Sequence, residues 1–125
     1  MEPVNLPDVE AEVVAALERY EDALVNNRVD VLDELFWNSP RTVRFGAGEN
    51  LYGRDAILAF RRSRPSAGLA RDVTRTQVTT FGTGFAVAHR EFTRDGSSKP
   101  GRQTQTWVRT EEGWRIVSAH VSQLL

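Results

Sequence analysis

Arg44 is the residue whose type and surroundings point most directly to chemistry in this chain of 125 residues. It lies between Val43 and Phe45 in a run with the alternation of a strand, so it faces away from those two apolar neighbours. Its guanidinium group either reaches solvent, in a surface ion pair, or meets a ligand that needs a cation. A guanidinium can hold a carboxylate through two parallel hydrogen bonds, but it cannot act as a base. Arg44 therefore favours the binding and orientation of a small acidic ligand.

Tyr20 is the second candidate, because it belongs to the apolar stripe of a predicted helix. It follows Leu17 by three residues and precedes Leu24 by four, which places all three side chains on one helix face. A tyrosine that points inward needs a polar partner for its hydroxyl group. Tyr20 is either a core tyrosine with a structural hydrogen bond or a phenol that donates to a bound carboxylate or acts as a general acid.

A glycine turn follows the strand of Arg44 and is succeeded by two polar residues. Gly46 and Gly48 interrupt the strand pattern, and Glu49 and Asn50 come directly after them. The turn lacks the third glycine of a dinucleotide-binding fingerprint. Glu49 and Asn50 belong either to a binding site or to a solvated turn in which Asn50 bonds its own backbone.

Polar residues also alternate along the last predicted strand. Ser118 and His120 have the same parity as Trp114 and Ile116, so the pattern places all four on one face of the strand. Such a face predicts either a polar cup that binds a ligand or a structural histidine bonded to a neighbouring strand.

Gln103 and Gln105 share a face with Trp107 on the preceding strand. Two glutamines in register can bind a ligand that carries an amide, or they can lie on a solvent-facing surface. The other polar residues are interpreted as sheet surface or as cations at the C-terminus of a helix, where positive charge is favourable. The first group is His89 and Glu91, and the second is Arg61, Arg62 and Arg64.

The elements that must position these side chains follow from the period of the apolar residues. Helices are expected over residues 5–26, where Asn5 is a candidate cap, and over residues 29–36 and 54–62. Long strands are expected over residues 72–81, 85–93, 102–109 and 114–122. Three helices followed by an antiparallel meander indicate the α+β class. A twisted sheet curved around the first helix would form a pocket between the two.

The composition excludes several classes of function. At this length one domain, residues 1–125, is expected to bury a core and form one pocket. A net charge of −1 and a pI of about 6.1 argue against a nucleic-acid partner. The chain has no cysteine and two histidines, which disfavours a metal centre. Neither a membrane span nor a signal-peptide pattern is visible, so we expect a cytoplasmic protein with no membrane partner.

The order of elements resembles the cone-shaped nuclear-transport-factor-2-like (SnoaL-like) fold. Within that superfamily, three segments resemble the AtzH-like family, which includes the HpxZ proteins of oxalurate catabolism. The segments are Glu18–Leu24, Arg44–Gly53 and Gly101–Arg109. The resemblance implies a small cytoplasmic protein that is encoded alongside amidases and has a possible functional association with one of them. It also implies a cofactor-free, decarboxylating amidohydrolase that acts on a carboxylated urea or ureido acid.

In this family the functional pair is a helix tyrosine and a strand arginine, which correspond to Tyr20 and Arg44. The strand lines the mouth of the pocket in the cone fold, so the resemblance places Arg44 inward, where it would grip the carboxylate of the substrate. Tyr20 would donate to the carbonyl or to the leaving group. Glu49 and His120 are both candidates for the base that activates water, and no metal or organic cofactor is expected.

Two other functions stay open at this point. The first is a non-catalytic protein that binds a small acid or supports an amidase. The second is a cofactor-free isomerase, dehydratase or cyclase of the same fold, which would need a wide apolar cup. We also expect a homodimer, because the sheet has more apolar positions than one concave core can use. These positions are Val73, Phe85, Val87, Val108, Val117 and Val121.

Overall fold

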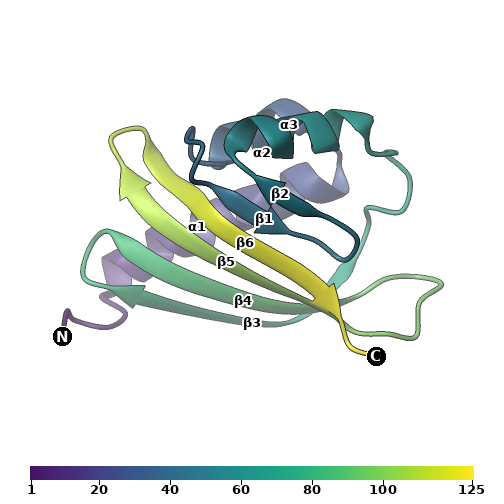
Figure 1. Cartoon of the computed structure of the whole chain (residues 1–125). Coiled ribbons are helices and arrows are strands. Elements are labelled where there is room, and N and C mark those ends of the chain that lie inside the picture. The colour runs from purple at the N-terminus through teal and green to yellow at the C-terminus, as the bar shows by residue number, and fades with distance from the viewer.

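Three helices cover one face of a six-stranded sheet in the computed structural model, which describes residues 1–125 (Figure 1). The helices are α1 (Pro7–Val25), α2 (Val29–Leu35) and α3 (Arg54–Ser63). The strands are β1 (Val43–Phe45), β2 (Asn50–Tyr52), β3 (Asp72–Phe81), β4 (Phe85–Thr93), β5 (Gly101–Thr110) and β6 (Gly113–Gln123). Their order in the sheet is β2-β1-β6-β5-β4-β3. The predicted α+β class, with a long first helix against a curved sheet, is confirmed.

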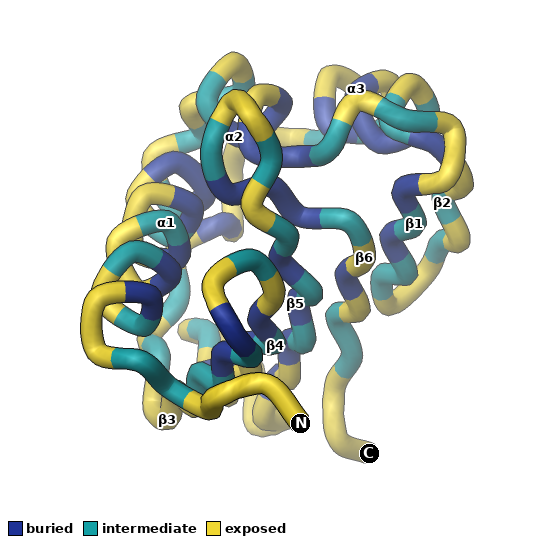
Figure 2. Tube along the Cα trace, turned by 90° about the vertical axis from the view of Figure 1, so that its left-hand side faces the viewer, coloured by how far each residue is buried: buried dark blue, intermediate teal, exposed yellow.

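The core lies between α1 and the inner face of the sheet. Val13 and Leu17 on α1 are fully buried, as are Trp107 and Ile116 on β5 and β6. Figure 2 shows that the buried stretches of α1 lie on its side toward the strands. Burying each such aliphatic side chain contributes roughly 1.5–3 kcal/mol, so the apolar stripe of α1 determines which way Tyr20 points.

The start of α1 differs from the prediction that Asn5 caps it. Leu6 occupies the N-cap position and makes no side-chain capping hydrogen bond. Asn5 has a left-handed backbone conformation with φ of 55° and accepts a hydrogen bond of 2.7 Å from the backbone N–H of Thr80. Its amide nitrogen donates to the carbonyl of Val78 at 3.3 Å. Asn5 therefore ties the N-terminal segment to β3 instead of capping the helix.

The stretch around Arg44 forms a hairpin, whereas the sequence predicted one strand followed by a turn into a helix. β1 pairs antiparallel with β2 and parallel with β6. The backbone N–H of Gly46 donates to the carbonyl of Glu49 at 2.9 Å and closes the turn. Arg44 lies opposite Leu51 on β2 and the buried Ala119 on β6, so it shares their helix-facing side of the sheet.

A β-bulge in β6 determines which face each of its later residues occupies. Trp107 pairs with Ile116, but the preceding residue, Thr106, pairs with Ser118. Val117 is therefore the extra residue, and beyond it the two faces of β6 exchange parity.

Candidate functional site

Tyr20 lies inside the protein, near several arginines. Its side chain is 3% exposed, and its ring meets the ring of Phe36 edge-on with the centroids 6.4 Å apart. Burial lowers the pKa of Arg61, Arg64 and Arg94, while the electrostatic influence of Tyr20 on each guanidinium acts in the opposite direction. Tyr20 therefore lies within electrostatic range of all three. With Arg44 they form what we call the arginine cluster: Arg44, Arg61, Arg64 and Arg94.

Arg61 comes from α3 and is the most deeply buried member of the cluster, with 3% exposure. Its guanidinium packs over the ring of Phe36, 5.1 Å from the centroid. The Nε and Nη1 atoms are buried without a hydrogen-bond partner, and the nearest carboxylate oxygen, Oδ1 of Asp33, is 3.7 Å from Nη1. Burial of an incompletely paired guanidinium is costly, so an anion at this position would stabilise the protein.

Arg64 and Arg94 lie at the ends of α3 and β4 and form no ion pair with a carboxylate. Nε and Nη2 of Arg64 and Nε of Arg94 are buried without a hydrogen-bond partner. Burial lowers the pKa of Arg64, and repulsion by Arg44 and Arg94 lowers it further. The region around Tyr20 thus holds more positive charge than its own carboxylates neutralise, which is the electrostatic character of an anion-binding site.

Arg44 borders the same region from β1 and has one carboxylate partner. Its Nη1 atom donates to Oε1 of Glu49 at 2.9 Å, and its guanidinium lies 5.4 Å from the ring centroid of Phe60. The Arg44 side chain is 9% exposed and the Glu49 side chain 24% exposed. Among the predicted site residues, Arg44 and Glu49 are in contact, and both lie with Tyr20 within electrostatic range of Arg64.

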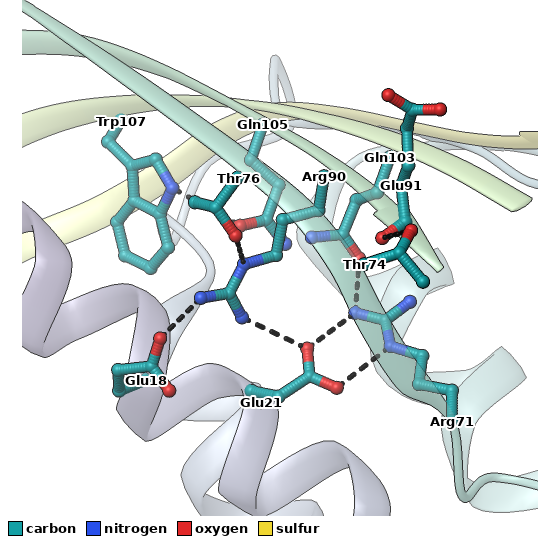
Figure 3. Close-up of polar contacts among 10 residues, drawn as sticks. All are labelled: Glu18, Glu21, Arg71, Thr74, Thr76, Arg90, Glu91, Gln103, Gln105 and Trp107. Atoms are coloured by element: carbon teal, nitrogen blue, oxygen red, sulfur yellow. Dashed lines mark hydrogen bonds and ion pairs between the residues drawn. The ribbon is translucent and has the colours of Figure 1, made fainter. Parts of the chain in front are cut away.

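A second ionic network fixes the part of α1 that carries Tyr20 (Figure 3). Glu21 accepts hydrogen bonds from Nε and Nη2 of Arg71, at 2.9 and 2.7 Å, and from Nη1 of Arg90 at 3.3 Å. Arg90 also pairs with Glu18, one turn earlier on α1. Partial burial raises the pKa of Glu21, but the two arginines outweigh it, so the pKa lies below its ordinary value. Glu21 is therefore an ionised anchor between the helix and the sheet.

Gln103 and Gln105 lie on the inner face of the sheet and not on a solvent-facing surface. Gln103 is 2% exposed, and its Oε1 atom accepts from Nη2 of Arg71 at 2.9 Å. Gln105 is fully buried and accepts from the indole N–H of Trp107 at 3.2 Å, while its Nε2 atom has no partner. Gln103 supports the network that holds α1, Gln105 bonds only Trp107, and neither has a hydrogen bond to Tyr20.

Ser118, His120 and Asn50 lie on the outer face of the sheet, away from Tyr20. All three are exposed, and the imidazole of His120 packs edge-on against Phe45 with the centroids 5.9 Å apart. The prediction that Ser118 and His120 share a face with Ile116 is wrong, because the bulge at Val117 reverses the parity. The parity argument assumed an uninterrupted strand, and neither residue belongs to the arginine cluster.

The sequence reasoning missed most of the arginine cluster. It interpreted Arg61 and Arg64 as cations at a helix end, and it did not consider Arg94. One local signal was available, because Arg61 follows Ile57 by four residues and therefore shares its buried helix face. Arg94 belongs to a different element, and nothing local indicates that it meets α3.

The largest surface cavity lies elsewhere and is not centred on this chemistry. It has a volume of about 680 Å³ and opens between α2, α3 and the turn from β5 to β6. Asp33 and Arg115 contribute to its wall, but Tyr20 and the arginine cluster do not. The cluster is the more specific site, because its buried guanidinium nitrogens without partners require an anion. No group of three or more histidine, aspartate or glutamate side chains is placed to hold a metal ion.

The helices on the inner face, the curved sheet and the enclosed polar interior define a protein of the nuclear-transport-factor-2-like class. The sequence model of the AtzH-like family matches residues 2–125, and the chain belongs to that family. No helix is both long and apolar enough to cross a membrane.

Solved structures agree with this assignment. A protein of unknown function of the DUF3225 family from Pectobacterium atrosepticum is 61% identical, with a TM-score of 0.96 over 98% of this chain and 95% of its own. A cystatin-like fold protein from Burkholderia xenovorans is 46% identical, with a TM-score of 0.95 over 99% and 98%. An NTF2-like protein from Pseudomonas putida, 18% identical with a TM-score of 0.77 over 92% and 86%, shares the fold. A search of curated proteins found no match.

Proposed function

We propose that this protein is a cofactor-free enzyme that acts on a small carboxylated urea or ureido acid, with decarboxylation as part of the reaction. The observation that carries the proposal is a set of guanidinium groups within electrostatic range of Tyr20, three of which, Arg61, Arg64 and Arg94, have buried nitrogens without protein partners. A small anion with polar groups at both ends satisfies such a site, whereas a hydrophobic substrate does not.

Each residue then has a distinct role in the loss of carbon dioxide. Arg44 binds and orients the carboxylate. When the bond between nitrogen and the carboxylate carbon breaks, its electron pair stays on nitrogen, and the remaining arginines of the cluster stabilise that charge. Tyr20 is the candidate general acid that protonates the nitrogen, which converts an N-carboxyurea and one proton into urea and carbon dioxide.

Hydrolysis of an amide bond additionally requires a base to activate water. Of the two bases that the sequence suggested, His120 faces the outside of the sheet, so Glu49 is the one that borders the arginine cluster. Glu21 is a poor alternative, because Arg71 and Arg90 stabilise its ionised form and lower its pKa.

The direct test is release of carbon dioxide from N-carboxyurea by the purified protein, measured against the spontaneous rate. We expect release that saturates with substrate concentration and is lost when Arg44 or Tyr20 is replaced. A protein that is stabilised thermally by the same compound but releases no carbon dioxide above background would contradict the enzyme and favour the small-acid-binding alternative.

Support of an amidase is the related non-catalytic alternative. It predicts that this protein changes the rate or the stability of an amidase mixed with it, while having no turnover of its own. The isomerase, dehydratase or cyclase alternative is disfavoured by the charge near Tyr20, because incompletely paired guanidinium groups are unfavourable neighbours for an apolar substrate.

A further inference from the structure

Glu49 occupies the position at Arg44 where a ligand carboxylate would bind. The two side chains form an ion pair of 2.9 Å at the edge of the arginine cluster, in which Arg64 and Arg94 have no carboxylate partner. We infer that Glu49 is an internal counter-ion which a substrate carboxylate displaces from Arg44, and that it is thereby a specificity-determining residue. The inference rests on the proposed function in one respect, namely that Arg44 receives the carboxylate of the ligand.

The contact has the geometry of a replaceable partner. Glu49 engages Arg44 through one oxygen, Oε1, while its other oxygen accepts from the backbone N–H of Gly48 at 3.2 Å. A free carboxylate can instead bind a guanidinium through two oxygens, which is stronger. Glu49 is also the more exposed of the two and lies in a turn of the β1–β2 hairpin, so its carboxylate can move off Arg44 and stay at the border of the cluster while Arg44 remains in place.

Gly46 makes room for this counter-ion. A Cβ atom at residue 46 would lie 1.9 Å from Oε1 of Glu49 and 2.7 Å from its Cδ, so the carboxylate would have to move. Gly46 does not have a left-handed φ, so alanine suits its backbone. Its Cβ would displace the Glu49 carboxylate and would also lie 3.1 Å from Nη1 of Arg44, a much smaller conflict. Gly48 lies in the same turn with no atom within 4 Å of its own Cβ position, and it provides a matched control.

The counter-ion makes Arg44 selective. A ligand carboxylate replaces the charge interaction that Arg44 loses when Glu49 moves away. A neutral amide of the same shape cannot replace it, so the amide binds more weakly. Removal of Glu49 should therefore strengthen the binding of a simple carboxylate. If Glu49 were instead a direct ligand of the substrate or a purely structural residue, its removal would weaken binding or leave it unchanged.

The experiment compares oxamate with oxamide, which differ by a carboxylate in place of an amide, by isothermal titration calorimetry. We expect wild type to bind oxamate in preference to oxamide. Glu49→Gln should bind oxamate roughly tenfold more tightly, with little change for oxamide. Gly46→Ala should shift oxamate affinity in the same direction although the charge of Glu49 is kept, and Gly48→Ala should match wild type.

The outcomes separate the inference from the proposed function. Oxamate binding that depends on Arg44 but is unchanged or weakened in Glu49→Gln and Gly46→Ala overturns the inference and leaves the function intact. Oxamate binding that survives Arg44→Ala contradicts the carboxylate anchor and with it the proposed function. If wild type does not bind oxamate, binding that first appears in Glu49→Gln supports the counter-ion, whereas no binding in any variant overturns it.

Discussion

Arg64 lies just beyond α3 and has two guanidinium nitrogens that are buried without a hydrogen-bond partner. Each buried polar group left unpaired costs about 1–3 kcal/mol, and a charged group costs more. Arg64 also experiences repulsion from Arg44 and Arg94, which contributes to its lowered pKa. At the scale of residues, the site is therefore stabilised by a bound anion and destabilised without one.

Replacement of Arg64 by methionine should make the ligand-free protein more stable and the site less able to bind. We expect the free energy of unfolding to rise by about 1 kcal/mol, because methionine keeps apolar contacts and needs no hydrogen bonds. Affinity for a small carboxylate should fall by about tenfold or more. Chemical denaturation and calorimetry measure the two effects. Arg62→Met is the matched control, since the Arg62 side chain is 66% exposed and should affect neither quantity.

Tyr20→Phe removes only the hydroxyl group, so the ring keeps its contact with Phe36. If Tyr20 is the general acid, turnover of a carboxylated urea should fall by roughly two to four orders of magnitude, and the free energy of unfolding should change by no more than about 1 kcal/mol. Steady-state kinetics with denaturation curves provide the comparison. Turnover at the wild-type rate would show that Tyr20 is not the general acid and that its role is structural.

Arg44→Lys keeps the positive charge but loses the planar guanidinium. The grip on a carboxylate should weaken by about 1–3 kcal/mol, seen as a higher KM or a weaker Kd, while the melting temperature changes little. In the double variant with Tyr20→Phe, the loss of transition-state stabilisation should be smaller than the sum of the two single losses, because both side chains act on one ligand. A fall of many degrees in melting temperature would instead identify Arg44 as a structural partner of Glu49.

At the scale of elements, the decisive contact is the attachment of α1 to the sheet. Glu21 lies next to Tyr20 in sequence and binds Arg71 and Arg90, which come from the segment before β3 and from β4. These bonds and the apolar stripe hold one helix turn in a defined position against the strands. A catalytic tyrosine benefits from that rigidity, because small displacements of a reacting group are costly.

The pH dependence of stability should report this attachment. The pKa of Glu21 is lower in the folded protein than its ordinary value of 4.5, so its contribution is present above that pH and is lost as the pH falls through the folded pKa. We expect Glu21→Gln to lose about 1–3 kcal/mol at pH 7 and to approach wild type in acid. Urea denaturation from pH 7 to 3 measures the difference. Glu91→Gln, at an exposed position of β4, should follow the wild-type curve.

At the scale of the whole molecule, the outer face of the sheet carries no helix (Figure 1). Cross-strand pairing places seven larger apolar or aromatic side chains on it. They are Val43, Phe45, Tyr52, Phe81, Phe85, Val87 and Val108. Val73 and Val121, which the sequence counted among the surplus apolar positions, pair with the buried Phe92 and Gln103 and lie on the inner side. We propose that a second copy of the chain covers the outer face with two-fold symmetry.

Light scattering at micromolar concentration should accordingly give the mass of a dimer, about twice the 14.1 kDa of one chain. Val87→Glu should shift the protein toward the monomer, because it introduces charge among the apolar side chains of the outer face. Val14→Glu, at a site on α1 that is 39% exposed, makes the same chemical change away from the sheet and should leave the dimer intact. A monomeric wild type would contradict the proposal.

Local patterns in the sequence were sufficient to predict the order of helices and long strands, the α+β class and the inward direction of Tyr20. The spacing of apolar residues along the chain distinguishes a helix from a strand. In a helix, the apolar stripe also shows which side chains point to the core. The family resemblance added the pairing of Tyr20 with Arg44. These predictions depend either on residues that are close in sequence or on the match of whole segments to a known family.

Only the tertiary structure decided which charged groups meet. Arg61 lies on α3 and Arg94 just beyond β4, and only the folded arrangement of these segments brings both within electrostatic range of Tyr20 on α1. The extra residue Val117 moved His120 to the outer face, because side chains alternate and one inserted residue exchanges the two faces. Burial of charge and strand register are properties of non-local contacts, so residue spacing alone does not determine them.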